Sequence, residues 1–293
     1  MSDLNTMRHS AAHVLAAAVA KLFPEAKFGV GPVVDNGFYY DVLVSRPLST
    51  EDFKALEAEM KNIIKFGLPM RREEMGIDEA IEFFKARGQD FKVELLQDLK
   101  TKGTTSVKPD EALTIDVAKP DTASLYWTGD FVDLCRGPHL ETTKEIGAFK
   151  LDRVAAAYWR GNQENPQLQR IYGLCFATKE DLKEFERLEE EAKKRDHRKI
   201  GQEMDLFTFS ELVGSGLPLW TPKGTVIRNE LDNYVWQLRA ARGFEKVTIP
   251  HITKKDLYET SGHWQKFSEE LFKIQTREGK LYCLKPMNCP HHT

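Results

Sequence analysis

Two pairs of residues in this 293-residue chain combine side-chain types and spacings that suit chemistry. His9 and His13 are four positions apart, so on a helix both rings project from the same face. Cys135 and His139 have the same spacing, but Gly137 and the proline after it predict a turn between them rather than a helix. Together the two pairs offer three imidazoles and one thiol.

Spacing alone leaves three interpretations of these pairs open. One cysteine and three histidines form a tetrahedral zinc ligand set. The same groups can hold and deprotonate a water molecule, or the pairs are unrelated surface residues. A metalloprotease of the HExxH type would lack its general base, because the chain has Ser10 where that motif needs glutamate.

The other cysteines carry weaker signals. Cys175 and Cys283 lie in apolar, strand-like runs and are expected in the core. Cys289 lies in KPMNCPHH, and a lone cysteine is more often a small buried residue than a ligand. Four scattered cysteines make no disulfide framework, so a reducing cytoplasm is the expected compartment.

A helix predicted over 6–23 must position the first histidine pair. Its apolar stripe lies nearly opposite the histidine face and consists of Met7, Ala11, Val14, Leu15, Ala18, Val19 and Leu22. The histidines are flanked by Ala12, Ala16 and Ala20. Because these side chains are small, the histidine face can approach another element closely and line a pocket.

The remainder of the first ~175 residues is predicted to be an α+β domain, because helical and strand patterns alternate irregularly. Short strands are expected over 28–44, with a tight turn at Asn36-Gly37, followed by helices over 50–66 and 78–87 and strands over 91–96, 113–117 and 124–127. Ser49 is the expected cap of the first of these helices, and Gly67 its end.

The pattern changes at 179–199, a charged stretch without Gly or Pro that predicts a solvated linker helix capped by Thr178. A second module follows Gly201 and looks incomplete. We expect in it a helix from Thr221 to Gly243, a strand over 244–249, and a hairpin-like pair over 271–276 and 281–286. The apolar stripe of its long helix is Ile227, Leu231, Tyr234, Val235 and Leu238.

Composition and charge exclude some classes of function for this chain. The chain has 42 basic and 45 acidic residues, a net charge of −3, which excludes a strongly basic nucleic-acid coat but not a local basic patch. No window approaches the ~20 consecutive apolar residues of a membrane span. The N-terminus lacks the layout of a signal peptide. The length suggests about two domains.

These residues resemble the threonyl-tRNA synthetase family nearly end to end. The segments that carry the resemblance, in family order and spacing, are RHSAAHVL, GPVVDNGFYYD, FVDLCRGPH, AYWRGN, LQRIYG, RDHRKIG, TSGHW and KPMNCP. The resemblance implies a two-domain α+β fold: an α/β tRNA-editing domain over 1–177, a linker helix over 178–201, and over 202–293 the start of a class II catalytic domain with an antiparallel sheet.

The chain departs from the family pattern in two ways. It lacks the small ubiquitin-like domain that commonly precedes the editing domain. It also stops before the class II motifs that bring the ATP-binding arginines, and before two of the three ligands of the catalytic zinc, whose cysteine is matched by Cys289. We therefore expect a fragment with a complete editing site and an incomplete aminoacylation site, which does not itself ligate threonine to tRNA.

An editing site has a physical rationale. Serine differs from threonine by one methyl group, and one missing methyl is worth about 1–3 kcal/mol, or 10–200-fold, which is too little discrimination for translation. A second site that hydrolyses seryl-tRNA removes the error. It must position a water molecule, take its proton and stabilise the developing oxyanion.

Carried over by the resemblance, the editing residues are His9, His13, Tyr40, Lys92, Asp133, Cys135 and His139. His9 and Cys135 would position water and transfer protons, and Lys92 would supply positive charge near the ester or the terminal ribose. Asp133 would orient a histidine or receive the amino group of serine, and Tyr40 would close the pocket. Without the resemblance, Lys92 would be a surface lysine on a strand and Tyr40 a core residue.

The resemblance also implies cofactors and partners. The full-length enzyme would use Zn²⁺ and ATP/Mg²⁺, whereas the editing site is expected to be metal-free. The expected partners are the tRNA for threonine, threonine, ATP and mischarged seryl-tRNA, with no membrane. The stretch from Thr221 to Pro250 resembles class II motif 1, which implies a homodimer for the full-length enzyme, in the cytoplasm.

Other functions remain open. The chain could be a freestanding hydrolase that edits seryl-tRNA in trans, although the class II motif and Cys289 favour a synthetase. It could be a non-catalytic tRNA-binding module, which would hydrolyse no ester. It could also be a zinc hydrolase of an unrelated substrate, which would hold stoichiometric zinc.

Overall fold

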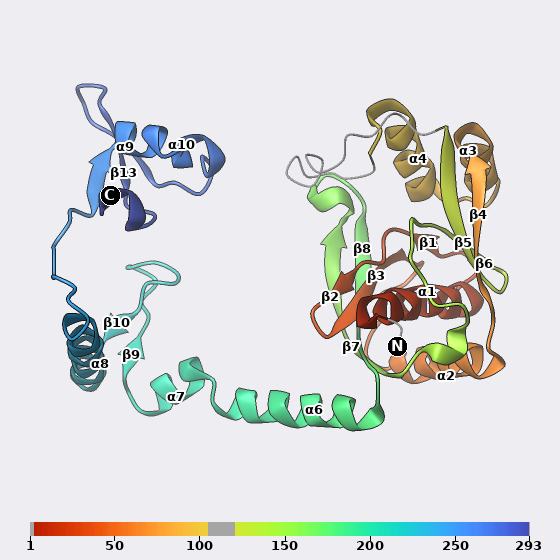
Figure 1. Ribbon diagram of the computed structural model, residues 1–293, viewed down its shortest axis with the longest axis horizontal. Coiled ribbons are helices and arrows are strands. Elements are labelled where there is room, and N and C mark those ends of the chain that lie inside the picture. Colours follow the sequence, from red (N-terminus) through yellow and green to blue (C-terminus); the bar gives the residue numbers. More distant parts are fainter. Residues whose placement is uncertain (1–2, 105–120, 293) are drawn as a thin grey trace. The chain divides into compact units, whose positions relative to one another are not determined.

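The computed structural model describes residues 3–104 and 121–292. The chain divides into two compact units, Met1–Lys194 and Arg195–Thr293, and both combine helices with antiparallel strands (Figure 1). The strand expected over 113–117 lies outside the described residues. In the part of the chain that is described, no helix has the length and apolar character needed to span a bilayer.

The main sheet of the first unit is antiparallel throughout. Its strands are β1 (Lys27–Phe28), β2 (Val33–Val34), β3 (Gly37–Leu43), β7 (Ala148–Tyr158) and β8 (Gln167–Phe176), in the order β1-β3-β8-β7 with β2 beside β3. Asn36 adopts a φ of 62° in the turn between β2 and β3, which confirms the tight turn expected at Asn-Gly.

Helix α1 (Leu4–Leu22) packs against this sheet and against α2 (Phe53–Phe66). The expected apolar stripe is confirmed from Met7 to Val19, but α1 is buried nearly all round: Ala12 and Ala16, on the histidine face, are as fully buried as Val14 on the stripe. The last expected stripe residue, Leu22, is instead 40% exposed. Helix α2 begins three residues later than expected and ends, as predicted, at Gly67 in a left-handed conformation.

A smaller antiparallel sheet consists of β4 (Met70–Gly76), β5 (Thr122–Thr128) and β6 (Phe131–Leu134). Helices α3 (Ile77–Ala86) and α4 (Asp90–Lys102) pack on it (Figure 1). Their shared core contains Ile77, Ala80, Phe84, Leu96, Leu99, Ala123 and Leu125.

The strand expected over 91–96 is wrong, because these residues belong to helix α4. The buried side chains of α4 are Phe91, Lys92, Leu95, Leu96 and Leu99, a set that recurs at helical rather than alternating spacing. A short apolar run fits either period, and here packing on both α3 and the Trp159 side chain selects the helix.

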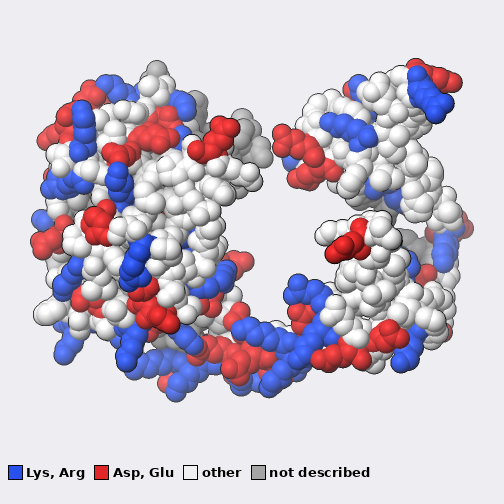
Figure 2. Space-filling model, turned by 180° about the vertical axis from the view of Figure 1, so that it is seen from behind, with Lys and Arg blue, Asp and Glu red and all other residues white. Residues whose placement is uncertain are grey.

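The predicted linker is two helices rather than one. Helix α6 (Lys179–Lys194) directly follows Thr178, whose hydroxyl accepts the Asp181 N–H at 3.1 Å as expected of its cap. It packs on β8, with the Phe176 and Phe185 rings 5.1 Å apart. The helical structure is then interrupted, and Asp196 caps the next helix, α7 (His197–Glu203). Along α6 acidic and basic side chains are interspersed, so it presents no single-sign surface (Figure 2).

The second unit contains one long helix, α8 (Pro222–Ala240), and several short elements. The others are β9 (Phe207–Thr208), β10 (Leu219–Trp220), β11 (Ile252–Lys254), α9 (Lys255–Thr260), α10 (His263–Lys266), β12 (Lys273–Gln275), β13 (Leu281–Leu284) and the 3₁₀ turn η3 (Cys289–His291). The expected hairpin is confirmed as β12–β13, and β11 completes its sheet. The strand expected over 244–249 is wrong, because these residues adopt no strand.

The apolar stripe of α8 is exposed within this unit. The exposed fractions of Ile227, Leu231 and Tyr234 are 43%, 60% and 58%, and Gly224 is the buried residue of the helix. An exposed apolar face of this extent usually marks an interaction surface.

Candidate active site

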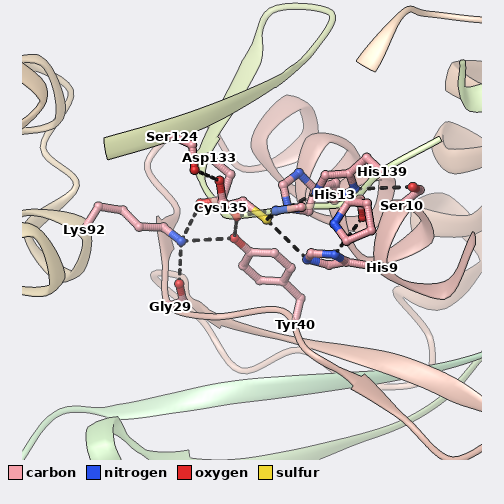
Figure 3. A network of polar contacts seen from close by, with 12 residues as sticks. His9, Ser10, His13, Gly29, Tyr40, Lys92, Ser124, Asp133, Cys135 and His139 are labelled. Atoms are coloured by element: carbon pink, nitrogen blue, oxygen red, sulfur yellow. Dashed lines mark hydrogen bonds and ion pairs between the residues drawn. The ribbon is translucent and has the colours of Figure 1, made fainter. Parts of the chain in front are cut away.

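Helix α1 positions the first histidine pair as its spacing predicts. His9 and His13 lie one turn apart with ring centroids separated by 5.4 Å and the rings edge to face. His9 is half-buried, whereas His13 is only 1% exposed. Both rings face the segment that follows β6 (Figure 3).

The second pair lies on that segment, which is fastened to its neighbours by polar contacts. The Cys135 N–H donates to the Ser124 carbonyl at 3.1 Å, and the Ser124 hydroxyl donates to the Cys135 carbonyl at 2.7 Å. Further along, the Leu140 N–H donates to the Ser10 hydroxyl of α1 at 2.9 Å. These contacts hold Cys135 and His139 over the histidine face of α1.

The four side chains converge on one point. Cys135 Sγ lies 3.3 Å from His9 Nε2 and 3.2 Å from His139 Nε2. The His139 ring centroid is 4.1 Å from that of His9 and 4.0 Å from that of His13. One possible ligand atom from each residue lies within 4.8 Å of all the others. The two pairs are therefore not unrelated surface residues.

A buried charge network lies beside this cluster and includes the other three predicted residues. Lys92 forms an ion pair with Asp133 and donates to the Gly29 carbonyl at 2.6 Å. The Tyr40 hydroxyl donates to Asp133, and His13 Nε2 lies 3.5 Å from the same carboxylate. Asp133 thus connects the network to the histidines (Figure 3).

Lys92 lies on a helix rather than on the expected strand. It is 2% exposed, so it is not the surface lysine that the sequence would suggest without the resemblance. Asp133 and Tyr40 are 3% and 0% exposed. A buried charge is costly in free energy unless it is paired. The Lys92 ammonium and the Asp133 carboxylate therefore each require the other as a counter-ion in order to remain buried.

Burial keeps the cluster neutral. Desolvation lowers the pKa values of His9, His13 and His139 below the usual value, and the neighbouring rings lower that of His139 further. Desolvation, with the nearby Asp133 charge, raises the pKa of Cys135 to about 12. At neutral pH the cluster therefore holds a thiol and neutral imidazoles, which suits proton transfer from water better than attack by a thiolate.

The same donor set fits zinc. Cysteine and histidine are the usual zinc ligands, and a tetrahedral site with their bond lengths has nitrogen–sulfur edges of about 3.5 Å. The two nitrogen–sulfur distances here, 3.2 and 3.3 Å, are close to that edge. In addition, His13 Nδ1 is buried without a hydrogen-bond partner.

Cys289 lies apart in the second unit, exposed on η3. Among the described residues, it joins no group of three possible metal ligands. Its expected role as a zinc ligand stays a prediction.

A cavity of about 590 Å³ adjoins the charge network. Lys92, Phe28 and Phe131 line it together with residues of α1, α2 and the β5–β6 turn, but the four cluster residues do not. It is therefore separate from the cluster itself.

Sequence reasoning missed Ser10 and Ser124 as polar residues of the site. In the sequence, Ser10 is notable only because it occupies the position where an HExxH motif has glutamate. Its place directly after His9, on a helix that packs closely against other elements, is the signal that could have identified it. Ser124 is revealed only by the pairing of β5 with β6.

Comparison with known proteins gives one matching family model and several similar curated proteins. Residues 123–172 match the family model described as the threonyl and alanyl tRNA synthetase second additional domain. This match includes Asp133, Cys135 and His139.

The chain is also similar to curated threonine–tRNA ligases over nearly its whole length. It is 47% identical to that of Gloeobacter violaceus over 99% of this chain and 44% of the relative. The ligase of Bacillus velezensis is 46% identical over 99% of this chain and 42% of its own. That of Dehalococcoides mccartyi is 44% identical over 100% and 47%. The chain thus spans less than half the length of these relatives.

Among solved structures, the RNA-binding domain of threonyl-tRNA synthetase from Cryptosporidium parvum matches 33% of this chain and 24% of its own. The sequence identity is 39% and the TM-score is 0.32, so this match carries no conclusion about the fold.

Proposed function

Because the chain resembles threonine–tRNA ligases over nearly its whole length, we propose that it is part of such an enzyme and that its first unit hydrolyses mischarged seryl-tRNA. The observation that carries the proposal is the convergence of His9, His13, Cys135 and His139 from two distant segments. The match of residues 123–172 to the threonyl and alanyl tRNA synthetase domain supports it.

In this proposal His9 acts as the general base. Its Nδ1 lies 3.2 Å from the Pro138 carbonyl, which can only accept, so Nδ1 carries the proton and Nε2 is left with its lone pair. A water held by the His9 Nε2 lone pair, beside Cys135, gives its proton to the imidazole and attacks the ester carbonyl. The bond to the ribose oxygen then breaks, and that oxygen takes the proton, releasing serine and tRNA.

The buried network has supporting roles. Asp133 orients His13 and balances the charge of Lys92, and Tyr40 closes the wall beside them. Lys92 is the cation of this network, and because Asp133 and the Tyr40 hydroxyl already hold its ammonium, we assign it the role of fixing Asp133 beside His13. Because Asp133 already has these partners, orienting His13 explains it better than binding the amino group of serine.

A direct test compares hydrolysis of seryl-tRNA and threonyl-tRNA, both on the tRNA for threonine, by the purified chain. We expect rapid loss of the seryl ester and sparing of the threonyl ester. His9→Ala should slow hydrolysis by about 10²-fold or more, the usual contribution of a general base. The exposed His197→Ala serves as the matched control. Equal rates with both esters, or an unaffected His9→Ala variant, would refute the proposal.

A zinc-dependent hydrolase is a second candidate, favoured by the donor set and by the unpartnered Nδ1 of His13. Three of the residues His9, His13, Cys135 and His139 would hold zinc, and the open fourth position would let it polarise a water or a carbonyl. The family resemblance favours the metal-free alternative. Elemental analysis after chelator treatment, with hydrolysis measured on the same sample, separates the two.

We further propose that the second unit contributes to ATP-dependent ligation of threonine, with Cys289 as a zinc ligand and ATP/Mg²⁺ as co-substrate. The similarity to curated threonine–tRNA ligases, which extends across this unit, supports this role. We also propose that the exposed stripe of α8 is the surface through which the enzyme forms a homodimer, because its large apolar side chains lack cover within the unit.

A further inference from the structure

We propose that Ser10 is a positioning residue that holds His139 in its Nδ1–H tautomer, so that the Nε2 lone pair of His139 faces the Cys135 thiol. This inference deepens the proposed hydrolysis and rests on it only for its kinetic test.

The argument begins with the single hydrogen of the Ser10 hydroxyl. Ser10 is fully buried on α1, and its Oγ donates to the Thr6 carbonyl one turn earlier at 2.8 Å. This is the shortest polar contact of the hydroxyl. Its hydrogen is therefore committed to the helix, and only lone pairs remain for other neighbours.

Two groups meet those lone pairs. The Leu140 N–H donates at 2.9 Å, and His139 Nδ1 lies at 3.3 Å. A bare Nδ1 would set one lone pair against another in a buried site, which is unfavourable. Hence His139 Nδ1 carries the proton and donates to Ser10.

A neutral imidazole has one ring proton, so His139 Nε2 is bare. It lies 3.2 Å from Cys135 Sγ (Figure 3). The backbone carbonyl of Pro138 imposes the same tautomer on His9, whose bare Nε2 lies 3.3 Å from the same sulfur.

The consequence is a surplus of acceptors. Two imidazole lone pairs compete for one thiol hydrogen, so one of them is always available to a water molecule. Ser10 supplies half of this arrangement. Without its hydroxyl, His139 could move its proton to Nε2 and donate to the sulfur, which removes one acceptor from the site.

Long-range ¹⁵N–¹H NMR of the imidazole rings, on chelator-treated protein near neutral pH, tests the tautomers directly. We expect His139 in the Nδ1–H form in the wild type and a substantial Nε2–H population in Ser10→Ala. Thr101→Ala is the matched control, because its hydroxyl also donates to the carbonyl one turn earlier in a helix and contacts no imidazole. Its His139 signals should keep the Nδ1–H pattern.

The kinetic arm measures hydrolysis of seryl-tRNA by the same proteins. Ser10→Ala should lower kcat by about 10- to 100-fold at nearly unchanged KM, which is less than the ~10²–10⁴-fold loss of a general base itself, because one of the two acceptors remains. Ser10→Thr, which keeps the hydroxyl, should restore the tautomer and most of kcat.

An Nε2–H tautomer of His139 in the wild type would overturn the inference, whether or not Ser10→Ala folds. An unchanged tautomer in a folded Ser10→Ala would do the same. A chain that hydrolyses no aminoacyl ester but shows the expected tautomers would refute the proposed function and leave the assignment to Ser10 in place.

Discussion

His9, His13 and His139 are neutral because they are buried together, and this choice of protonation state affects folding as well as chemistry. In the unfolded chain each ring binds a proton near pH 6.5. In the folded protein burial opposes that proton. Acid therefore favours the unfolded chain, which binds more protons.

We predict that the free energy of unfolding of the chelator-treated chain is nearly constant between pH ~7 and ~8 and falls as the pH falls below ~6.5. The sign follows from folded pKa values below the unfolded ones, and the slope is up to about 1.4 kcal/mol per pH unit for each histidine. Urea denaturation at a series of pH values measures it. His139→Gln should flatten the slope. A profile that rises toward acid would contradict the neutral cluster.

The Lys92–Asp133 pair leads to a second prediction at the residue scale. Lys92→Met leaves a buried carboxylate without its cation, so it should destabilise the fold by about 3–5 kcal/mol. Adding Asp133→Leu should recover part of this loss, because the orphaned charge is removed. A double-mutant cycle in urea gives the coupling. Purely additive effects would mean that the two side chains act independently.

The spacing within the first histidine pair could be interpreted from the sequence, but the places of Lys92 and Ser10 in the fold could not. The spacing of His9 and His13 fixes their common face on any helix. By contrast, whether Lys92 is buried depends on the secondary structure of its segment, which a short apolar run leaves open. The contacts of Ser10 depend on a segment 130 positions away, and no local pattern records them.

At the scale of elements, helix α4 decides where Lys92 points, and its packing can be tested. Leu96 is fully buried on α4, whereas Gln97 next to it is exposed. Leu96→Ala should cost about 2–5 kcal/mol of unfolding free energy, and Gln97→Ala should change it by less than ~0.5 kcal/mol. Urea denaturation of both variants provides the comparison. Similar costs at both positions would argue against this helix.

Sequence patterns identified the elements whose signals are local. The Asn36 turn, the end of α2 at Gly67 and the capped start of α8 at Thr221 all depend on residues within one turn. The misassigned strand over 244–249 and the all-round burial of α1 depend on distant partners. A strand requires a neighbour to pair with, and a helix face is buried only if another element covers it.

At the scale of the whole molecule, the exposed stripe of α8 predicts self-association. If α8 is the dimer surface, sedimentation should show a concentration-dependent dimer. Leu231→Glu, which places a charge at a 60% exposed position in the stripe, should shift the chain to monomer without loss of helical content. Glu203→Gln, on α7, serves as a surface control. A chain that is monomeric at all concentrations would contradict the proposed role of α8.

The site is assembled from segments that are far apart in the sequence, and this has a consequence for synthesis on the ribosome. His9 and Cys135 are 126 positions apart, and strand β3 cannot pair with β8 until residues 167–176 have been synthesised. Closing so long a loop is entropically costly until many contacts form together. The histidine pair of α1 therefore leaves the ribosome well before the segments that complete the site, and it acquires its chemistry late. Until β8 has been synthesised, the nascent chain would carry these histidines as ordinary, protonatable side chains.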